Sequence, residues 1–315
     1  GNGMYQKGQS FELLNALSNI QMHGYVGVLN SCDIYLEDII KWFFEVYIKN
    51  EFGANGFICN MPEKSDSILS KYERVATVMD GETKQFKLFC EEGEIDRELY
   101  EMISGSVRYK EIPSLIKNKY AYANSNEIVR EMHDMFSDQC MLSYTEKTGS
   151  KYNTFFELLR LENVKPEEIE EYNFDELNWL LERGVVYVSD GMLALNYERI
   201  WILKELNDKG VICLQYKDSD ILRKLISEGE IRVESSLLSE SEWEYFNYVL
   251  NKSEFSNGLD LRNRYIHDTN PLDKRHQQND YIVLLKMFVI LVIKINEEFC
   301  LQDKISKKGV DFYEL

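Results

Sequence analysis

A long apolar stretch near the end of the chain limits the possible folds more than any other feature. The segment from Asp280 to Cys300 is typical of a helix, and its first half is apolar on nearly all sides. Only Lys286 interrupts the run from Tyr281 to Ile293. A helix of this kind must be buried on most sides, either in a bundle core or against a second subunit. The run is too short to span a membrane, so we expect no membrane association.

Capping signals predict three more helices in the last hundred residues. One helix begins at Ser219, and a second begins at the capping box formed by Ser239 and Glu242. Asn257 is expected to cap a third helix. Together with the apolar helix, these elements predict a helical bundle over residues 217–315.

Residues 161–216 combine a short helix with a predicted β-hairpin. The strand-like runs 185–188 and 192–195 flank Ser189-Asp190-Gly191, a strong turn signal. A helix followed by a hairpin resembles a winged-helix unit. DNA binding needs basic side chains for phosphate contacts, yet residues 161–185 carry eight acidic and only two basic side chains. We therefore expect this unit to serve packing or protein contacts.

Residues 1–160 are predicted to form a mainly helical, mixed region of unknown class. From Leu36 onward, apolar residues recur at the spacing of one helix face. The runs 86–89 and 119–122 are strand-like. The overall expectation is an α+β fold, mainly α, in which this mixed region and the winged-helix-like unit precede the C-terminal bundle.

The sequence offers no pattern for a metal ion or an organic cofactor, and we expect none. Its six cysteines lack zinc-site spacing and suggest reduced thiols in a cytoplasmic protein. Asp80 and Glu82 faintly resemble the carboxylate pair of a metal nuclease, but a solvated turn around Gly81 is the better interpretation. The signatures of kinases, α/β-hydrolases, metalloproteases and dinucleotide-binding folds do not occur.

The charge balance restricts any nucleic-acid partner. The chain has 36 basic and 54 acidic residues, a formal net charge of −18. Such a surface repels a phosphate backbone at long range, which argues against a general nucleic-acid coat. A small, locally basic pocket stays compatible with this charge. RNA is therefore expected only as a selective partner.

One short motif in the predicted third helix suggests a chemistry. In Arg262-Asn263-Arg264-Tyr265-Ile266-His267, a helical conformation places Asn263 and His267 one turn apart on the same face. His267 would lie near the helix end beside Asp268, and both neighbours favour its protonated form. Such a histidine can transfer protons near neutral pH, and an adjacent guanidinium can bind a phosphate. The motif predicts phosphodiester cleavage without metal, with Arg262, Asn263 and His267 as catalytic residues.

Further basic side chains lie close to the motif in the sequence. Those expected to bind the substrate are Arg264, Lys274, Arg275 and His276.

This motif, the preceding run 257–261 and the apolar helix that follows resemble the HEPN superfamily, in particular uncharacterised bacterial HEPN ribonuclease- and toxin-like proteins. The resemblance covers about the C-terminal third of the chain. It implies a HEPN-like helical bundle that acts as a metal-independent endoribonuclease in toxin or defence systems. Arg262 would stabilise the scissile phosphate, His267 would act as general acid or base, and Asn263 would support them while the RNA 2′-hydroxyl attacks the adjacent phosphate.

The resemblance also implies partners. Nuclease members of this superfamily typically dimerise so that two motifs share a cleft, so we expect a homodimer through the C-terminal bundle. An antitoxin or sensor protein is a further expected partner. Asp268 stands where relatives often have glycine, a difference expected to retune the histidine or to restrict backbone approach.

A second interpretation of the motif stays open. Many HEPN domains bind partners or nucleotides without cleaving anything, so the chain could be a non-catalytic binding or assembly module in a bacterial defence or regulatory system. Arg262 would then pair with a carboxylate such as Asp268 or Glu254, and His267 would cap the helix end. An Arg262 held in an internal salt bridge would favour this interpretation.

Overall fold

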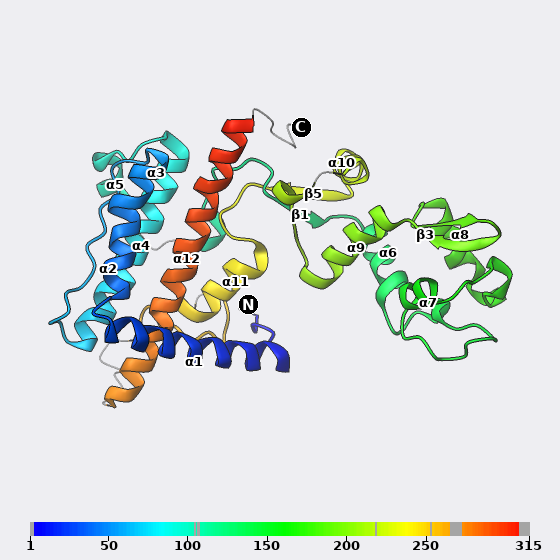
Figure 1. Cartoon of the computed structure of the whole chain (residues 1–315), viewed down its shortest axis with the longest axis horizontal. Helices are drawn as coiled ribbons and strands as arrows, with labels where there is room; N and C mark the ends of the chain where they lie inside the picture. Colours follow the sequence, from blue (N-terminus) through cyan, green and yellow to red (C-terminus); the bar gives the residue numbers. More distant parts are fainter. Residues whose placement is uncertain are drawn as a thin grey trace. The chain divides into compact units, whose positions relative to one another are not determined.

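The structure, a computed structural model, describes residues 3–103, 105, 108–217, 219–252, 254–264 and 273–308. These residues are mainly helical and include two small antiparallel sheets, which confirms the predicted α+β, mainly α class. The chain divides into two compact units (Figure 1). Unit 1 contains the described residues of 1–116 and 236–310, and unit 2 contains those of 117–235.

This division differs from the expected ranges 1–160, 161–216 and 217–315. The chain enters unit 2 at residue 117 and returns to unit 1 at residue 236, so the N-terminal and C-terminal segments share one hydrophobic core. A helix expected in the C-terminal bundle, α10 (Asp220–Ser227), lies in unit 2 instead. Such long-range pairing of chain ends leaves no local signal in the sequence.

Unit 1 is built around the apolar helix at the end of the chain. Its elements are α1 (Gln9–Ser31), α2 (Leu36–Trp42), the π-helical turn η1 (Phe43–Tyr47), α3 (Ile48–Phe52), α4 (Ile68–Glu92), α5 (Arg97–Met102), the 3-10 turn η2 (Tyr109–Glu111), α11 (Glu240–Leu250) and α12 (Lys274–Lys308). The predicted apolar helix is confirmed in α12, which packs against α4, α3, α2 and α1 (Figure 1). Leu284, Phe288 and Leu291 on α12 are fully buried, as expected for a core helix.

The amphipathic segment that begins at Leu36 is also confirmed. It runs through α2, η1 and α3, and its apolar face, which includes Ile40, Phe44 and Ile48, is buried in the core. Gly53 ends it with φ of +72°, the left-handed conformation that glycine adopts at helix ends.

The predicted strand at residues 86–89 is wrong. These residues belong to α4, whose 25 residues follow a helical pattern of buried side chains that includes Tyr72, Val75, Met79 and Phe86. The short run Phe-Lys-Leu-Phe imitates a strand, but the longer helical period decides the structure.

Unit 2 contains a three-stranded sheet, a hairpin and several helices. Its elements are β1 (Tyr120–Ala123), α6 (Asn126–Phe136), η3 (Met141–Ser143), α7 (Phe155–Leu161), η4 (Pro166–Glu168), η5 (Glu171–Asn173), α8 (Phe174–Glu182), β2 (Val186–Ser189), β3 (Met192–Leu195), α9 (Tyr197–Lys209), β4 (Ile212–Cys213), η6 (Leu214–Tyr216), α10 and β5 (Ile231–Glu234). In the sheet β1 lies between β4 and β5, and both pairings are antiparallel. The strand predicted at 119–122 is thus confirmed in β1.

The predicted hairpin is confirmed as β2 and β3. Val186 pairs with Leu195, and Ser189 pairs with Met192 across the turn. Asp190 and Gly191 both have positive φ, of 52° and 77°, as a tight two-residue hairpin turn requires. The resemblance of residues 161–216 to a winged helix stays a prediction.

A buried ionic cluster ties the helices of unit 2 together. Glu131 on α6 is fully buried and accepts hydrogen bonds from Arg183 Nε at 2.6 Å and from Arg199 Nε at 2.9 Å. Arg183 also pairs with Glu230, just before β5. One carboxylate in the middle of α6 therefore connects the end of α8 to the start of α9.

None of the described helices combines the length and the apolar content that crossing a bilayer would require.

Replacing Glu131 with Ala should lower the free energy of unfolding of unit 2 by about 3–5 kcal/mol, because the buried Arg199 and the partly buried Arg183 lose their shared counter-charge. Denaturant unfolding monitored by fluorescence measures this loss. Asp208→Ala is the control: it removes the exposed pair with Lys204 and should cost less than about 1 kcal/mol. Equal effects of the two variants would contradict the structural role of the cluster.

Candidate functional site

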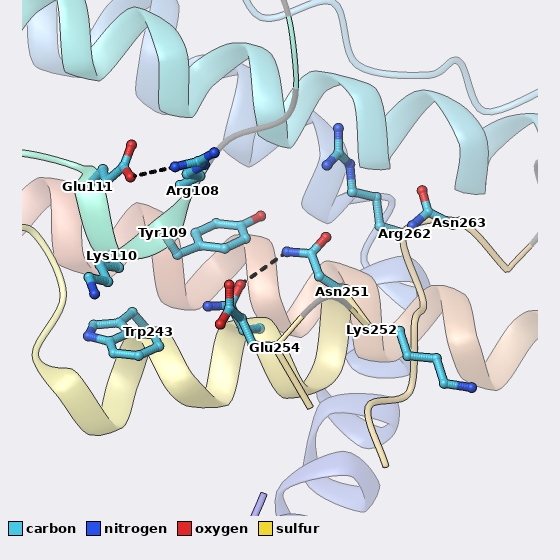
Figure 2. A pocket seen from close by; sticks show the side chains of 11 residues that line it. Arg108, Tyr109, Lys110, Glu111, Trp243, Asn251, Lys252, Glu254, Arg262 and Asn263 are labelled. Atoms are coloured by element: carbon cyan, nitrogen blue, oxygen red, sulfur yellow. Dashed lines mark hydrogen bonds and ion pairs between the residues drawn. The ribbon is translucent and has the colours of Figure 1, made fainter. Parts of the chain in front are cut away.

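A cavity of about 740 Å³ in unit 1 brings part of the predicted motif together with residues from two other segments (Figure 2). Its walls come from the η2 segment, from α11 and from residues 251–263. The lining residues are Arg108, Tyr109, Lys110, Glu111, Trp243, Asn247, Asn251, Lys252, Glu254, Arg262 and Asn263.

The segment 257–264 lies at this cavity because its backbone amides bond to the last carbonyl groups of α11. The backbone amides of Leu259, Leu261 and Arg262 donate hydrogen bonds to the last carbonyl groups of α11. Those carbonyls have no partners within their own helix. Residues 257–264 are consequently extended or in turns, so the third helix expected from Asn257 is wrong for the described residues.

Asn257 has a different role from the predicted helix cap. Its side chain accepts a hydrogen bond from the backbone amide of Tyr5 at 2.9 Å and donates to the Tyr5 carbonyl at 3.1 Å. The next residue, Gly258, approaches the end of α11 so closely that an added Cβ would lie 2.9 Å from the Asn251 carbonyl oxygen. A larger residue at position 258 would therefore push the segment off the helix.

Arg262 forms an ion pair with Asp80, which lies in the middle of α4. Asp80 is only 7% exposed, so the interpretation of residues 80–82 as a solvated turn is wrong. Burial raises the pKa of the Asp80 carboxyl to about 6, and the Arg262 charge opposes this shift. Asp80 Oδ1 has no hydrogen-bond partner among the residues that the structure describes.

The side chain of Tyr109 forms a buried part of the cavity wall (Figure 2). Burial raises the pKa of its hydroxyl, and the nearby negative charge of Asp80 adds to this effect. Within the described part of the chain, the hydroxyl finds no hydrogen-bond partner. Buried polar atoms normally have partners, so a bound ligand or water is the simplest way to satisfy this one.

Only some of the predicted site residues reach the cavity. Arg262 and Asn263 line it, and Asn263 Nδ2 donates to Asp260 Oδ1 at 2.9 Å. Arg264 instead pairs with Asp280 at 2.8 Å and donates to the Leu259 carbonyl. His267, together with Asp268, lies outside the described residues.

The other predicted substrate-binding residues begin α12 and do not line this cavity. Asp273 caps that helix: its carboxylate accepts from the Arg275 amide at 2.9 Å and lies 3.0 Å from His276 Nδ1. The backbone amide of Arg275 and the His276 side chain lower the pKa of Asp273. His276 thus belongs to a helix terminus, and Lys274 lies beside it in the same exposed turn.

The charge of the cavity differs from that of the whole chain. Its lining includes the cations Arg108, Lys110, Lys252 and Arg262 but only the two acids Glu111 and Glu254. Arg108 pairs with Glu111 at 3.1 Å. The Lys110 ammonium lies 5.8 Å from the centre of the Trp243 ring, which leaves an indole in a basic setting. A surplus of positive charge here contrasts with a net charge of −18 overall.

No model of a known protein family, no curated protein and no solved structure matches this chain. The described residues also contain no cluster of three or more His, Cys, Asp or Glu side chains arranged to hold a metal ion.

Sequence reasoning missed most of the cavity. Trp243, Tyr109 and Lys252 were not among the predicted site residues. Each is unremarkable locally, and the sequence carries no signal that they meet. Asp80 did stand out as an acid, but its partner lies 182 positions further along the chain.

Replacing Arg262 with Met should destabilise the protein in a pH-dependent way. The folded-state pKa of Asp80 is already above its unfolded value, so its contribution to stability is present below about pH 3.8 and is lost as the pH rises through 6. Removing Arg262 raises that pKa further. The free energy of unfolding of the variant should therefore fall by about 3 kcal/mol at pH 8 and by much less at pH 5. Denaturant unfolding at both pH values measures the difference.

The double variant Asp80→Asn/Arg262→Met is the matched control, because it has no buried charge left at this position. It should lose the pH dependence between pH 5 and 8. If Arg262→Met lowered the free energy of unfolding equally at pH 5 and pH 8, Arg262 would not act through Asp80.

Proposed function

We propose that this protein is a selective RNA-binding module, and that the cavity between η2, α11 and residues 251–263 holds a short single-stranded segment. The observation that carries the proposal is that one cavity of a strongly acidic chain is lined by a surplus of cations together with an indole. Sequence-selective RNA recognition targets unpaired bases, which stack on aromatic side chains while cations hold the phosphates.

The lining suits these tasks. Lys252 and Lys110 supply charge for phosphate groups, and Trp243 offers a ring on which a base can stack. The amides of Asn251 and Asn263 can donate and accept hydrogen bonds at base edges. The volume of about 740 Å³ falls within the usual range of small-molecule sites, which favours a few nucleotides over a duplex.

Binding takes precedence over cleavage because of the state of Arg262. Its guanidinium is paired with Asp80, which offsets the charge that a catalytic arginine would present to a scissile phosphate. This internal ion pair was the feature expected of a non-catalytic HEPN-type module. A defence or regulatory role, with an antitoxin or sensor as partner, stays part of the same proposal.

The binding test uses fluorescence anisotropy with short labelled single-stranded RNAs of varied sequence. Trp243→Ala should weaken binding of the preferred RNA about tenfold or more, since a stacked base contributes roughly 1–3 kcal/mol. Lys252→Glu should weaken it further and reduce its salt dependence.

Trp201→Ala is the matched control, because Trp201 is an exposed tryptophan of unit 2 outside this cavity. The Trp201→Ala variant should bind the preferred RNA with the same affinity as the unchanged protein. Absence of binding to every RNA tested, or equal losses in the two tryptophan variants, would rule out the cavity as an RNA site.

Metal-independent RNA cleavage is the second candidate function, favoured by one observation. Arg262 and Asn263 both line the cavity, so an RNA phosphate bound there could compete with Asp80 for the Arg262 guanidinium. His267 would then serve as general acid or base for attack by the 2′-hydroxyl. The chemistry would leave a cyclic phosphate and a free 5′-hydroxyl.

The cleavage test incubates RNA with the protein in EDTA and resolves the products by electrophoresis. If the chain is a nuclease, His267→Ala should reduce the rate by a factor of about 100 or more, as loss of a general acid or base does. His276→Ala, at the exposed start of α12, should retain the rate. Uncut RNA that is nevertheless bound would leave the binding module as the function.

A further inference from the structure

The inner side of helix α1 carries two asparagines as well as the buried Met22, while most of its aliphatic side chains face outward. On its inner side, the Asn15 and Asn19 side chains accept hydrogen bonds from the buried Lys286 ammonium at 3.0 and 2.6 Å. Asn15 also accepts from the Tyr245 hydroxyl at 2.8 Å. These bonds fix the rotation of α1 about its axis, because a buried ammonium needs its acceptors.

The outer side of α1 carries a continuous apolar surface. Its large members are 46–67% exposed. They are Leu13, Leu14, Leu17, Ile20 and Val28. A soluble monomer rarely leaves so many aliphatic side chains together in water, so such a surface marks an interaction site.

The spacing of this surface matches helix pairing. Leu13, Leu17, Ile20, Gly24 and Gly27 follow one another at intervals of four, three, four and three residues. This is the seam of a heptad repeat, which faces a partner helix in a coiled coil. No atom lies within 4 Å of a Cβ added at Gly24 or Gly27, so both glycines face open space. At about 1.5 Å per residue, the helix has length for three heptads.

The charge of α1 indicates what can cover it. Between Gln9 and Ser31 the only charged residue is Glu12, and Lys7 lies 3.5 Å from its carboxylate. The chain as a whole has a charge of −18, so two copies repel each other over most of their surfaces. The outer face of α1 is a place where two copies can approach without bringing like charges together.

We propose that the outer face of α1 binds the same face of a second copy, with the two helices antiparallel. In that arrangement Leu17 lies against the partner's Gly24, and the two-fold axis passes near Ile20. Bulky residues in the first half of the helix fill the spaces above glycines in the second half, so the surface complements itself as a two-fold interface requires. This interface differs from a dimer through the C-terminal bundle and does not depend on RNA binding.

The first test measures mass by sedimentation equilibrium. The unchanged protein should approach twice the 37.2 kDa of one chain, and Leu17→Asp should raise the dimer dissociation constant by a factor on the order of 100 or more, since it buries two charges at the interface. Leu161→Asp, at an exposed leucine of α7, should leave the dimer intact. Both leucines are exposed, so neither variant should unfold the chain, and circular dichroism checks this.

A monomer at every accessible concentration would overturn the proposal, as would a dimer that Leu17→Asp leaves unchanged. Retained dimer in Leu17→Asp would point to another face, such as the C-terminal bundle. Binding of a monomer to lipid vesicles through α1 would likewise assign this face to a different partner.

The second test distinguishes the two helix orientations. In a Cys32→Ser background, which removes an exposed thiol at the end of α1, Leu17→Cys and Gly24→Cys are made separately. A short bis-maleimide should link the two proteins when they are mixed and should link neither with itself. Efficient linking within the Leu17→Cys protein alone would contradict the antiparallel arrangement.

Discussion

The ion pair between Asp80 and Arg262 is the interaction on which the candidate site depends. It connects the middle of α4 to the segment that follows α11, and that segment in turn satisfies the last carbonyl groups of α11. Asp80 would be costly to bury alone, as its raised pKa shows, so its position makes sense only with a cation beside it. The same contact brings Arg262 and Asn263 to the wall of the cavity.

This dependence shapes what the cavity can do. The ion pair holds Arg262 in place, but the Asp80 carboxylate neutralises part of its positive charge. The remaining cations, the indole of Trp243 and the unpartnered hydroxyl of Tyr109, again within the described residues, still favour an anionic, aromatic ligand. RNA binding therefore needs no rearrangement of Arg262, whereas cleavage requires a phosphate to draw it away from Asp80. The energetic cost of that exchange separates the two proposed functions.

The sequence predicted those features that short segments determine. The capping box of Ser239 and Glu242, the Asp190-Gly191 turn and the apolar helix α12 all formed as expected, because each depends on neighbouring residues. Features that depend on distant partners were mispredicted or missed. Asn257 resembles a helix cap but binds Tyr5, and Asp80 resembles a solvated acid but pairs with Arg262. The cavity itself joins three chain segments, so no local pattern could reveal it.

The orientation of helix α1 also depends on a distant residue and could not be predicted from its own sequence. Its apolar residues alone would be expected to face the core, yet the buried Lys286 ammonium requires acceptors, and only the Asn15–Asn19 side of the helix supplies them. Satisfying one buried charge outweighs burying several aliphatic side chains, because an unpaired ammonium in the core costs more than exposed leucines do. The leucines are then left for a second surface. In a chain with a net charge of −18, a nearly uncharged and self-complementary helix face is a suitable place for two copies to meet.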